Sequence, residues 1–106
     1  MSRSGTESRT ARERLRERVD GWAARLRVQP ARVRIQPMRH KWGSCSARGT
    51  ITLSCSLLHE SADFRDFVIV HELLHLQIRN HGRLFRARLG AHCPQWQRLG
   101  TLSRCQ

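Results

Sequence analysis

Apolar residues in the first third of the chain recur at helical spacing. One stripe consists of Leu15, Val19, Trp22 and Leu26. These positions are i, i+4, i+7 and i+11 of a single helix face, and arginine and glutamate fill the opposite face. The pattern predicts an amphipathic helix that begins near Ala11 and ends at Gln29-Pro30. Residues 1–10 carry no apolar stretch, so we expect a disordered basic tail there.

Three short segments in the middle of the chain have the pattern of β-strands. Residues 32–36 alternate polar and apolar side chains, as a half-buried strand does. Residues 42–46 and 50–54 are β-prone runs joined by Ala47-Arg48-Gly49, which predicts a hairpin. The segment from Leu57 to Glu60 is expected to be a connector.

The second half of the chain has the pattern of three helices. Ser61 is a plausible N-cap for a helix over residues 62–79. A second helix is predicted over 82–89, ending at Gly90, and a third begins at Pro94. The resulting expectation is an α+β fold, with a three-stranded sheet and flanking helices in one domain over residues 11–106.

Charge is the most unusual feature of the composition. The 106 residues carry 20 Lys+Arg against 8 Asp+Glu, a net charge of +12, and all the basic residues except Lys41 are arginine. Such a surface attracts polyanions, so nucleic acid is one partner to consider. A basic surface that is simply solvated explains the same composition, and both interpretations stay open.

The cysteines and the N-terminal residues indicate a compartment. Cys45, Cys55, Cys93 and Cys105 form no CxxC pair, which argues against a second zinc site of the usual spacing. The N-terminal residues lack the apolar core of a signal peptide, and no run approaches the roughly 18 apolar residues of a membrane span. We therefore expect a cytoplasmic protein with free thiols and no contact with a membrane.

The candidate chemistry lies in the helix predicted over residues 62–79. His71, Glu72 and His75 form an HExxH motif, and side chains four apart leave one face of a helix. Two imidazoles can then hold a divalent metal, and Glu72 can take a proton from a water at an open coordination position. The apolar residues before His71 indicate that this helix is buried. Polar side chains in a buried helix need partners, and a bound metal would provide one.

A third ligand can be sought by elimination. No Asp or Glu follows Glu72, so a histidine must complete the site, unless this half of the chain supplies no further ligand. His81 reaches the metal only if the helix stops before it. Asn80 and Gly82 tolerate the left-handed conformation that ends helices. We expect the helix to run to about Arg79 and to turn immediately afterwards.

Three segments together resemble a known family. MRHKWGSCSARGTITLS, DFVIVHELLHL and NHGRLF, in this order, are similar to the YgjP-like metallopeptidases, a zincin group related to SprT-like domains. The resemblance runs from about residue 33 to 99. It implies a small zincin-like domain, zinc bound by His71, His75 and His81, and Glu72 as the general base. Family members tend to have Asn in place of Ser54 and Trp in place of Arg86.

Three functions are compatible with these features. The first is a zinc metallopeptidase that hydrolyses peptide bonds by a metal-activated water with Glu72 as general base. The second is a zinc-dependent nucleotide pyrophosphatase acting on UTP, a role attached to one branch of the family. The third is a basic zinc module that binds nucleic acid without catalysis.

A peptidase of this kind also needs a donor to stabilise the oxyanion. Tyrosine, a frequent donor, is absent, and His40, His92 and Arg83 are the remaining candidates by type.

Overall fold

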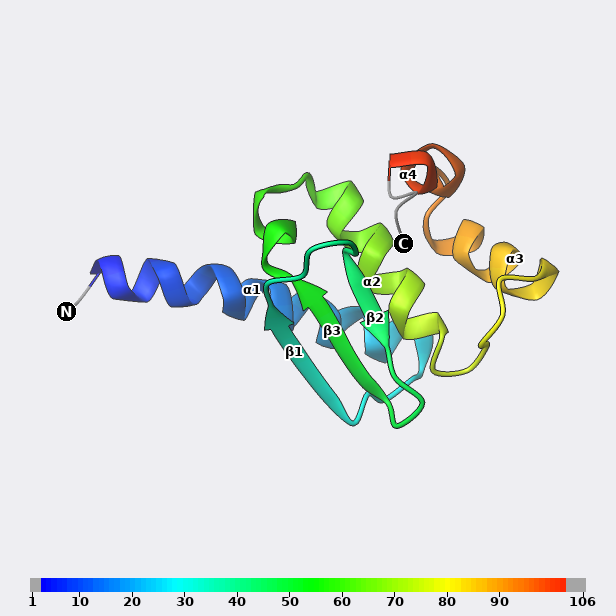
Figure 1. Ribbon diagram of the computed structural model, residues 1–106, viewed down its shortest axis with the longest axis horizontal. Helices are drawn as coiled ribbons and strands as arrows, with labels where there is room; N and C mark the ends of the chain where they lie inside the picture. The colour runs from blue at the N-terminus through cyan, green and yellow to red at the C-terminus, as the bar shows by residue number, and fades with distance from the viewer. Residues whose placement is uncertain (1–2, 103–106) are drawn as a thin grey trace.

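A three-stranded sheet and two long helices form the two layers of the molecule (Figure 1). The computed structural model describes the backbone of residues 3–102 and the side chains of residues 11–100. Its elements are α1 (Arg3–Leu26), β1 (Arg32–Gln36), β2 (Gly43–Cys45), β3 (Thr50–Ser54), the 3-10 helix η1 (Cys55–His59), α2 (Ala62–Leu74), α3 (Arg83–His92) and α4 (Trp96–Leu102). Helices α1 and α2 lie behind the sheet, and α3 and α4 lie at one side of it. The predicted α+β fold is confirmed.

The strands have the order β1-β3-β2. Strands β2 and β3 form the predicted antiparallel hairpin, and β1 pairs with β3 in parallel. The hairpin turns at Gly49, whose φ of 91° lies in the left-handed region that favours glycine. Since β3 is central, β1 and β2 are the two edge strands.

The core lies between the sheet and the helices. Ile51 and Leu53 of β3 are fully buried against it, whereas Thr50 and Thr52 lie on the opposite face. The stripe predicted for α1 is buried, which confirms that this helix packs through one face. Outside the core, Arg18 of α1 donates to both carboxylate oxygens of Asp66 of α2 at 2.7 and 2.5 Å. Two-point pairing of this kind fixes the orientation of the two helices.

Helix α1 differs from its predicted bounds at both ends. The backbone is helical from Arg3, where the sequence predicts a disordered tail over residues 1–10; residues 1–2 lie outside the described part. Extending an existing helix adds one hydrogen bond per residue, so a segment of low propensity can continue it. The other end lies at Leu26, because Arg27 takes a φ of 59° and the N–H of Val28 bonds to the carbonyl of Ala23. This is a Schellman-type cap with arginine in the position usually held by glycine.

Helix α3 continues past the residue predicted to stop it. It runs to His92, so the predicted end at Gly90 is wrong. A Cβ at Gly90 would lie 2.9 Å from Nε1 of Trp96. The glycine therefore serves close packing of α3 against Trp96 and not a turn. No helix in the described range is long and apolar enough to cross a membrane.

Candidate metal centre

The first turn of α2 sets the phase of the helix that carries the HExxH motif. Ser61 is extended, and its hydroxyl accepts a hydrogen bond from the N–H of Phe64 at 3.2 Å, which confirms it as the N-cap. Asp63 lies in the first turn, where a carboxylate complements the helix dipole. From this start, His71 and His75 fall one turn apart, with ring centroids separated by 4.9 Å.

The other end of α2 lies earlier than predicted. The helix ends at Leu74 and not near Arg79. The backbone N–H groups of His75, Leu76 and Gln77 bond to carbonyls three residues back, and that of Ile78 bonds to Leu74 at 2.8 Å. This tightening turns the chain about five residues sooner than the predicted helix would. It brings His81 back over the last turn of α2, as the predicted ligand set requires.

Three histidines converge at this end of α2. One ligand atom from each of His71, His75 and His81 lies within 4.8 Å of the other two. The ring of Phe85 packs against all three imidazoles, with centroid distances of 5.3, 4.7 and 5.0 Å, and is 1% exposed. Phe85 belongs to α3, so the site is built on two helices. The sequence pattern indicates only that Phe85 is apolar; its position under the imidazoles depends on how α3 packs.

Hydrogen bonding and burial favour the metal-binding form of two of these imidazoles, those of His75 and His81. Nδ1 of His75 lies 2.9 Å from the carbonyl of Ile78. A carbonyl can only accept, so this contact assigns the proton to Nδ1 and leaves Nε2 as the acceptor. Nε2 of His81 lies 2.9 Å from that Nε2. Burial lowers the pKa of both His75 and His81, which favours neutral imidazole. The donor set therefore fits a divalent metal that prefers nitrogen ligands.

Glu72 is buried between α2 and the sheet. It is 3% exposed, and its Oε2 lies 3.2 Å from Nδ1 of His71. A Cβ at Gly43 of β2 would lie 3.0 Å from Cγ of Glu72, 3.2 Å from the carbonyl oxygen of Thr52 and 3.2 Å from a methyl of Val68. The absence of a side chain at Gly43 thus lets the strand approach Glu72 directly. The sequence places Gly43 at the start of a hairpin strand and does not reveal this contact.

Substituting Gly43 by alanine should destabilise the fold. The backbone oxygen of Thr52 cannot move away without disturbing the hairpin, so we expect a loss of about 1–3 kcal/mol in the free energy of unfolding. Gly21→Ala is the matched control, because Gly21 is an α1 residue with nothing within 4 Å of its Cβ position. That control should gain about 0.5–1 kcal/mol from helix propensity. Urea unfolding of both variants measures the difference, and a neutral Gly43→Ala would contradict the close packing.

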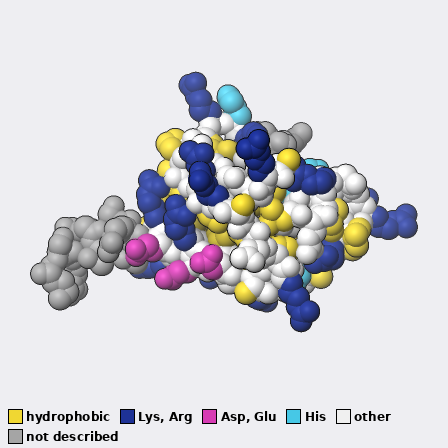
Figure 2. All heavy atoms as spheres, turned by 90° about the horizontal axis from the view of Figure 1, so that it is seen from below, with side chains coloured by type: hydrophobic (Ala, Val, Ile, Leu, Met, Phe, Trp, Pro, Cys, Tyr) yellow, Lys and Arg dark blue, Asp and Glu magenta, His cyan; other side chains and the backbone are white. Residues whose placement is uncertain are grey.

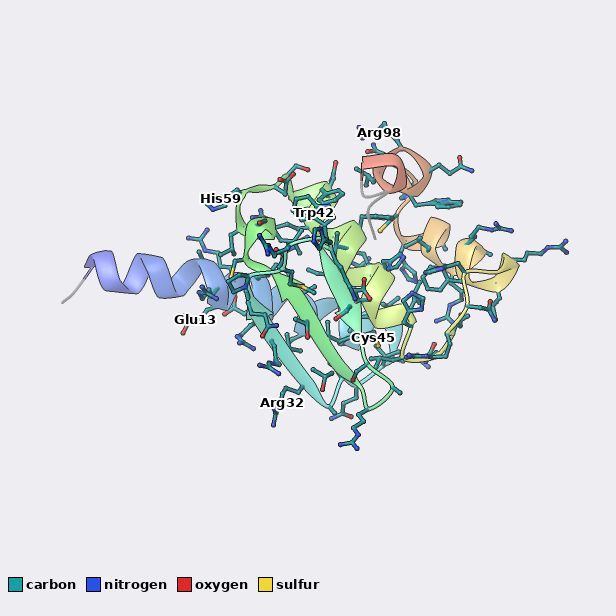
Figure 3. All side chains as sticks on the ribbon, in the orientation of Figure 1. Glu13, Arg32, Trp42, Cys45, His59 and Arg98 are labelled. Atoms are coloured by element: carbon teal, nitrogen blue, oxygen red, sulfur yellow. The ribbon has the colours of Figure 1, made fainter. Side chains whose placement is uncertain are left out.

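Strand β2 has a free edge beside the histidines. The N–H of Ser54 donates to the carbonyl of Trp42, and the N–H of Ser46 donates to the carbonyl of Thr50, each at 2.9 Å, so the residues on either side of β2 bond to β3. By the antiparallel alternation, the N–H and C=O groups of Gly43 and Cys45 point away from β3. Gly43 is buried and Cys45 is half-buried, so Cys45 is the more accessible of the two to an extended chain laid along β2. Figure 3 labels Cys45 at the end of this strand.

Cys45 is tied to the segment that carries His81. Arg79 donates to its Sγ at 3.7 Å and to the carbonyl of His75 at 3.1 Å, which links the turn after α2 to β2. Burial raises the pKa of the Cys45 thiol and Arg79 partly opposes the rise. Within the described residues, the group that could hold a metal ion consists of the three histidines and does not include Cys45. Cys45, Cys55 and Cys93 are free thiols, as expected; Cys105 lies outside the described residues.

None of the three candidates for oxyanion binding has a recorded contact with the histidine cluster. His92 packs edge-on against Trp22 at 5.8 Å, and its pKa is lowered by burial and then by Arg25 and Arg88. His40 is exposed in the loop between β1 and β2, and Arg83 is exposed at the start of α3. No contact in the described part of the chain assigns the oxyanion donor.

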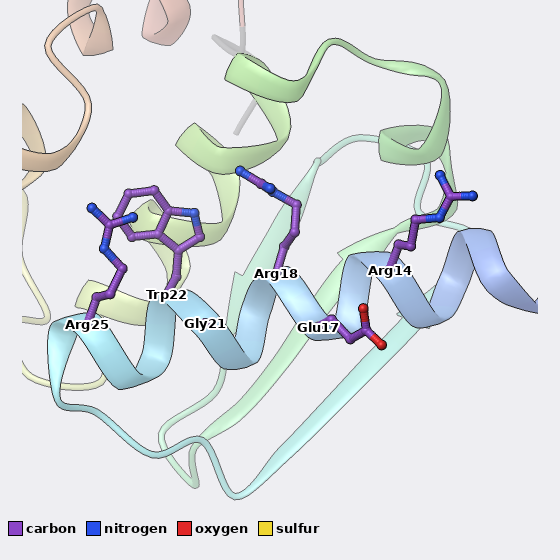
Figure 4. Close-up of a pocket in the computed structure, with 6 residues that line it drawn as sticks. All are labelled: Arg14, Glu17, Arg18, Gly21, Trp22 and Arg25. Atoms are coloured by element: carbon purple, nitrogen blue, oxygen red, sulfur yellow. The ribbon is translucent and has the colours of Figure 1, made fainter.

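A hollow of about 390 Å³ on α1 is separate from the histidine cluster. Its lining consists of Arg14, Glu17, Arg18, Gly21, Trp22 and Arg25 (Figure 4). The cationic groups there are already engaged in part: Arg25 lies 4.3 Å over the Trp22 ring and Arg18 pairs with Asp66. None of the lining residues belongs to the histidine cluster. An anion bound in this hollow would therefore not lie beside the histidines.

Comparison with known proteins agrees with the geometry. A family model described as YgjP-like, metallopeptidase domain matches residues 5–102. The chain belongs to this family. As a YgjP-like metallopeptidase it requires a metal ion, and its three histidines could hold one. The family membership confirms the resemblance carried by the three sequence segments.

The solved structures that resemble this YgjP-like domain include two from archaea. Both are metallopeptidase zymogens, jannalysin of Methanocaldococcus jannaschii and abylysin of Pyrococcus abyssi. Jannalysin has a TM-score of 0.67 and 25% identity, covering 74% of this chain and 80% of its own. Abylysin has a TM-score of 0.64 and 25% identity, covering 72% of this chain and 76% of its own. No curated protein matches the sequence.

Proposed function

We propose that this protein is a zinc-dependent metallopeptidase that cleaves peptide bonds with Glu72 as the general base. The observation that carries the proposal is the convergence of three imidazoles, two from α2 and one from the turn that follows it, beside the buried carboxylate of Glu72. Membership in a metallopeptidase family supports the reaction class. The assignment of individual roles follows from the chemistry of the side chains.

Zinc is the metal that we assign to His71, His75 and His81. Catalytic zinc sites use three protein ligands and keep a further position open, and this site offers three nitrogen donors. When bound, the metal polarises the scissile carbonyl and lowers the pKa of its water to about 7. The protein's part is to hold the imidazoles neutral and oriented, which the Ile78 carbonyl does for His75.

Glu72 moves the proton in this scheme. Its carboxylate accepts the proton of the attacking water and then delivers it to the nitrogen of the leaving amine. Burial limits competition from bulk water, and the contact of Gly43 with Cγ restricts the side chain to the space between α2 and β2. His71 also holds the carboxylate through its Nδ1 at 3.2 Å.

The substrate would be an extended peptide paired with the free edge of β2. The outward-facing main-chain groups of the half-buried Cys45 can bond to such a peptide by strand addition. This contact is made by backbone and is independent of the peptide's side chains. It would hold the scissile bond beside α2 because Gly43 lies directly against Glu72.

Hydrolysis of casein should distinguish this function from the nucleotide pyrophosphatase alternative. We expect casein to be cleaved by the protein, the activity to be lost with a chelator, and zinc to restore it, while UTP is left intact. The chelator-sensitive release of pyrophosphate from UTP, with no casein cleavage, would assign the alternative. Retention of zinc without turnover of either substrate would support a non-catalytic zinc module.

A further inference from the structure

The sheet has one face that none of the described helices covers. Helices α1 and α2 both lie on the opposite side of it (Figure 1). Strand pairing places the uncovered side chains in two cross-strand rows, which we call the sheet face: Arg32, Thr50 and Ser46 in one, and Arg34, Thr52 and Ser44 in the other. Val33 and Ile35 pack against the core, which confirms that Arg32 and Arg34 project the other way. Figure 3 shows Arg32 extending away from the sheet.

The sheet face carries positive charge and hydrogen-bond donors but no carboxylate. Arg32 and Arg34 are exposed, and neither makes a side-chain hydrogen bond or ion pair recorded for the described residues. Positions two apart on a strand are separated by about 6.6 Å, so their guanidinium groups form a short line. In Figure 2 the visible Asp and Glu side chains lie together near the N-terminal part, apart from the Lys and Arg side chains gathered above them.

Two further arginines extend this line along the outer edge of β1. Arg16 donates to the carbonyl of Val33 at 2.8 Å, and Arg12 donates to that of Ile35 at 3.3 Å. These bonds occupy acceptors that another strand would need, so β1 is a poor partner for strand addition. A guanidinium has five N–H donors, so each arginine retains donors for an anion. Four arginines therefore follow β1.

We propose that the sheet face, with Arg12 and Arg16, binds the phosphate backbone of single-stranded nucleic acid. Arginine forks match phosphate oxygens, and the hydroxyls of Thr50 and Thr52 add neutral donors beside them. A flat face suits an extended strand, whereas reading a duplex requires a helix or ribbon that enters a groove. Neither row contains an aromatic side chain for base stacking, so binding would rest on contacts to phosphate, which carry no sequence information. This surface acts independently of peptide hydrolysis at the histidines.

The test is the binding of a fluorescent oligothymidylate of about twenty nucleotides, followed by anisotropy over a range of salt concentrations. The variant Arg32→Gln/Arg34→Gln is compared with Arg83→Gln/Arg86→Gln, which removes the same charge from exposed positions on α3. We expect the sheet-face variant to weaken binding at low salt by at least about tenfold. The slope of log K against log salt should flatten by about 1.4, from two contacts of about 0.7 each.

The α3 variant should bind nearly as well as the unmodified protein. An equal loss in both variants would assign the affinity to diffuse charge and overturn the proposal, as would undetectable binding at low salt. Tighter binding of a duplex of the same length would overturn the single-strand assignment. Equal affinity for oligothymidylate and oligoadenylate would support backbone recognition. Melting curves serve as the folding control, because both pairs of arginines are exposed.

Discussion

The substitution Glu72→Gln is expected to lower kcat for peptide hydrolysis by about 10²- to 10⁴-fold. Glutamine has nearly the same shape and can keep the contact with His71, but its amide cannot accept a proton from the attacking water. The metal ligands are unchanged, so the zinc content should stay at that of the unmodified protein. Initial rates on casein, measured with the zinc content of the same sample, separate these effects.

A matched variant makes the expected loss specific. Glu17→Gln introduces the same chemical change on the exposed surface of α1, and we expect it to leave kcat unchanged. If Glu72→Gln retained a near-normal rate with full metal content, another group would be the base. If it lost the metal, the experiment would report on the stability of the site and not on proton transfer.

Replacing His81 by alanine should remove the bound zinc about as effectively as replacing His75. Each substitution leaves two imidazoles, and two protein ligands hold zinc much less tightly than three. His81 is exposed and follows the turn after α2, so its truncation should leave the helices intact. Elemental analysis of dialysed protein gives zinc per chain, with one zinc expected for the unmodified protein. This readout does not require a substrate.

The control for the metal experiment is another exposed histidine. His59 lies at the end of η1 and is not part of the ligand group among the described residues. His59→Ala should retain one zinc per chain. Full zinc retention by His81→Ala would remove His81 from the ligand set and would leave the site with two histidines. Far-UV circular dichroism distinguishes loss of metal from loss of fold.

Local patterns in the sequence were sufficient to predict the helix that carries the HExxH motif and the strands beside it. The N-cap at Ser61 and the four-residue spacing of His71 and His75 depend on contacts within one helix, so they can be predicted from neighbouring residues. The alternation in β1 and the glycine turn between β2 and β3 are also local. His81 was predicted by composition, because no acid follows Glu72.

Contacts between distant segments decided the remaining features. The end of α2 at Leu74 was not predictable from helix propensity, because the backbone changes there to hydrogen bonds between residues three apart. The position of Phe85 beneath the imidazoles depends on how α3 packs. From the sequence, Gly90 was predicted to end α3. The structure shows instead that the absence of a side chain at Gly90 lets Trp96 pack closely against this helix.

What the sequence by itself determined about this protein is the set of chemical groups and the periodicity that places His71, Glu72 and His75 on one helix. Only the tertiary structure decided the strand order β1-β3-β2, which leaves the edge of β2 free and seals that of β1 with Arg12 and Arg16. It also brought Gly43 against Glu72. The physical reason is that helix phase is set by hydrogen bonds between near neighbours, whereas strand order and close approach are set by packing between residues far apart in the chain.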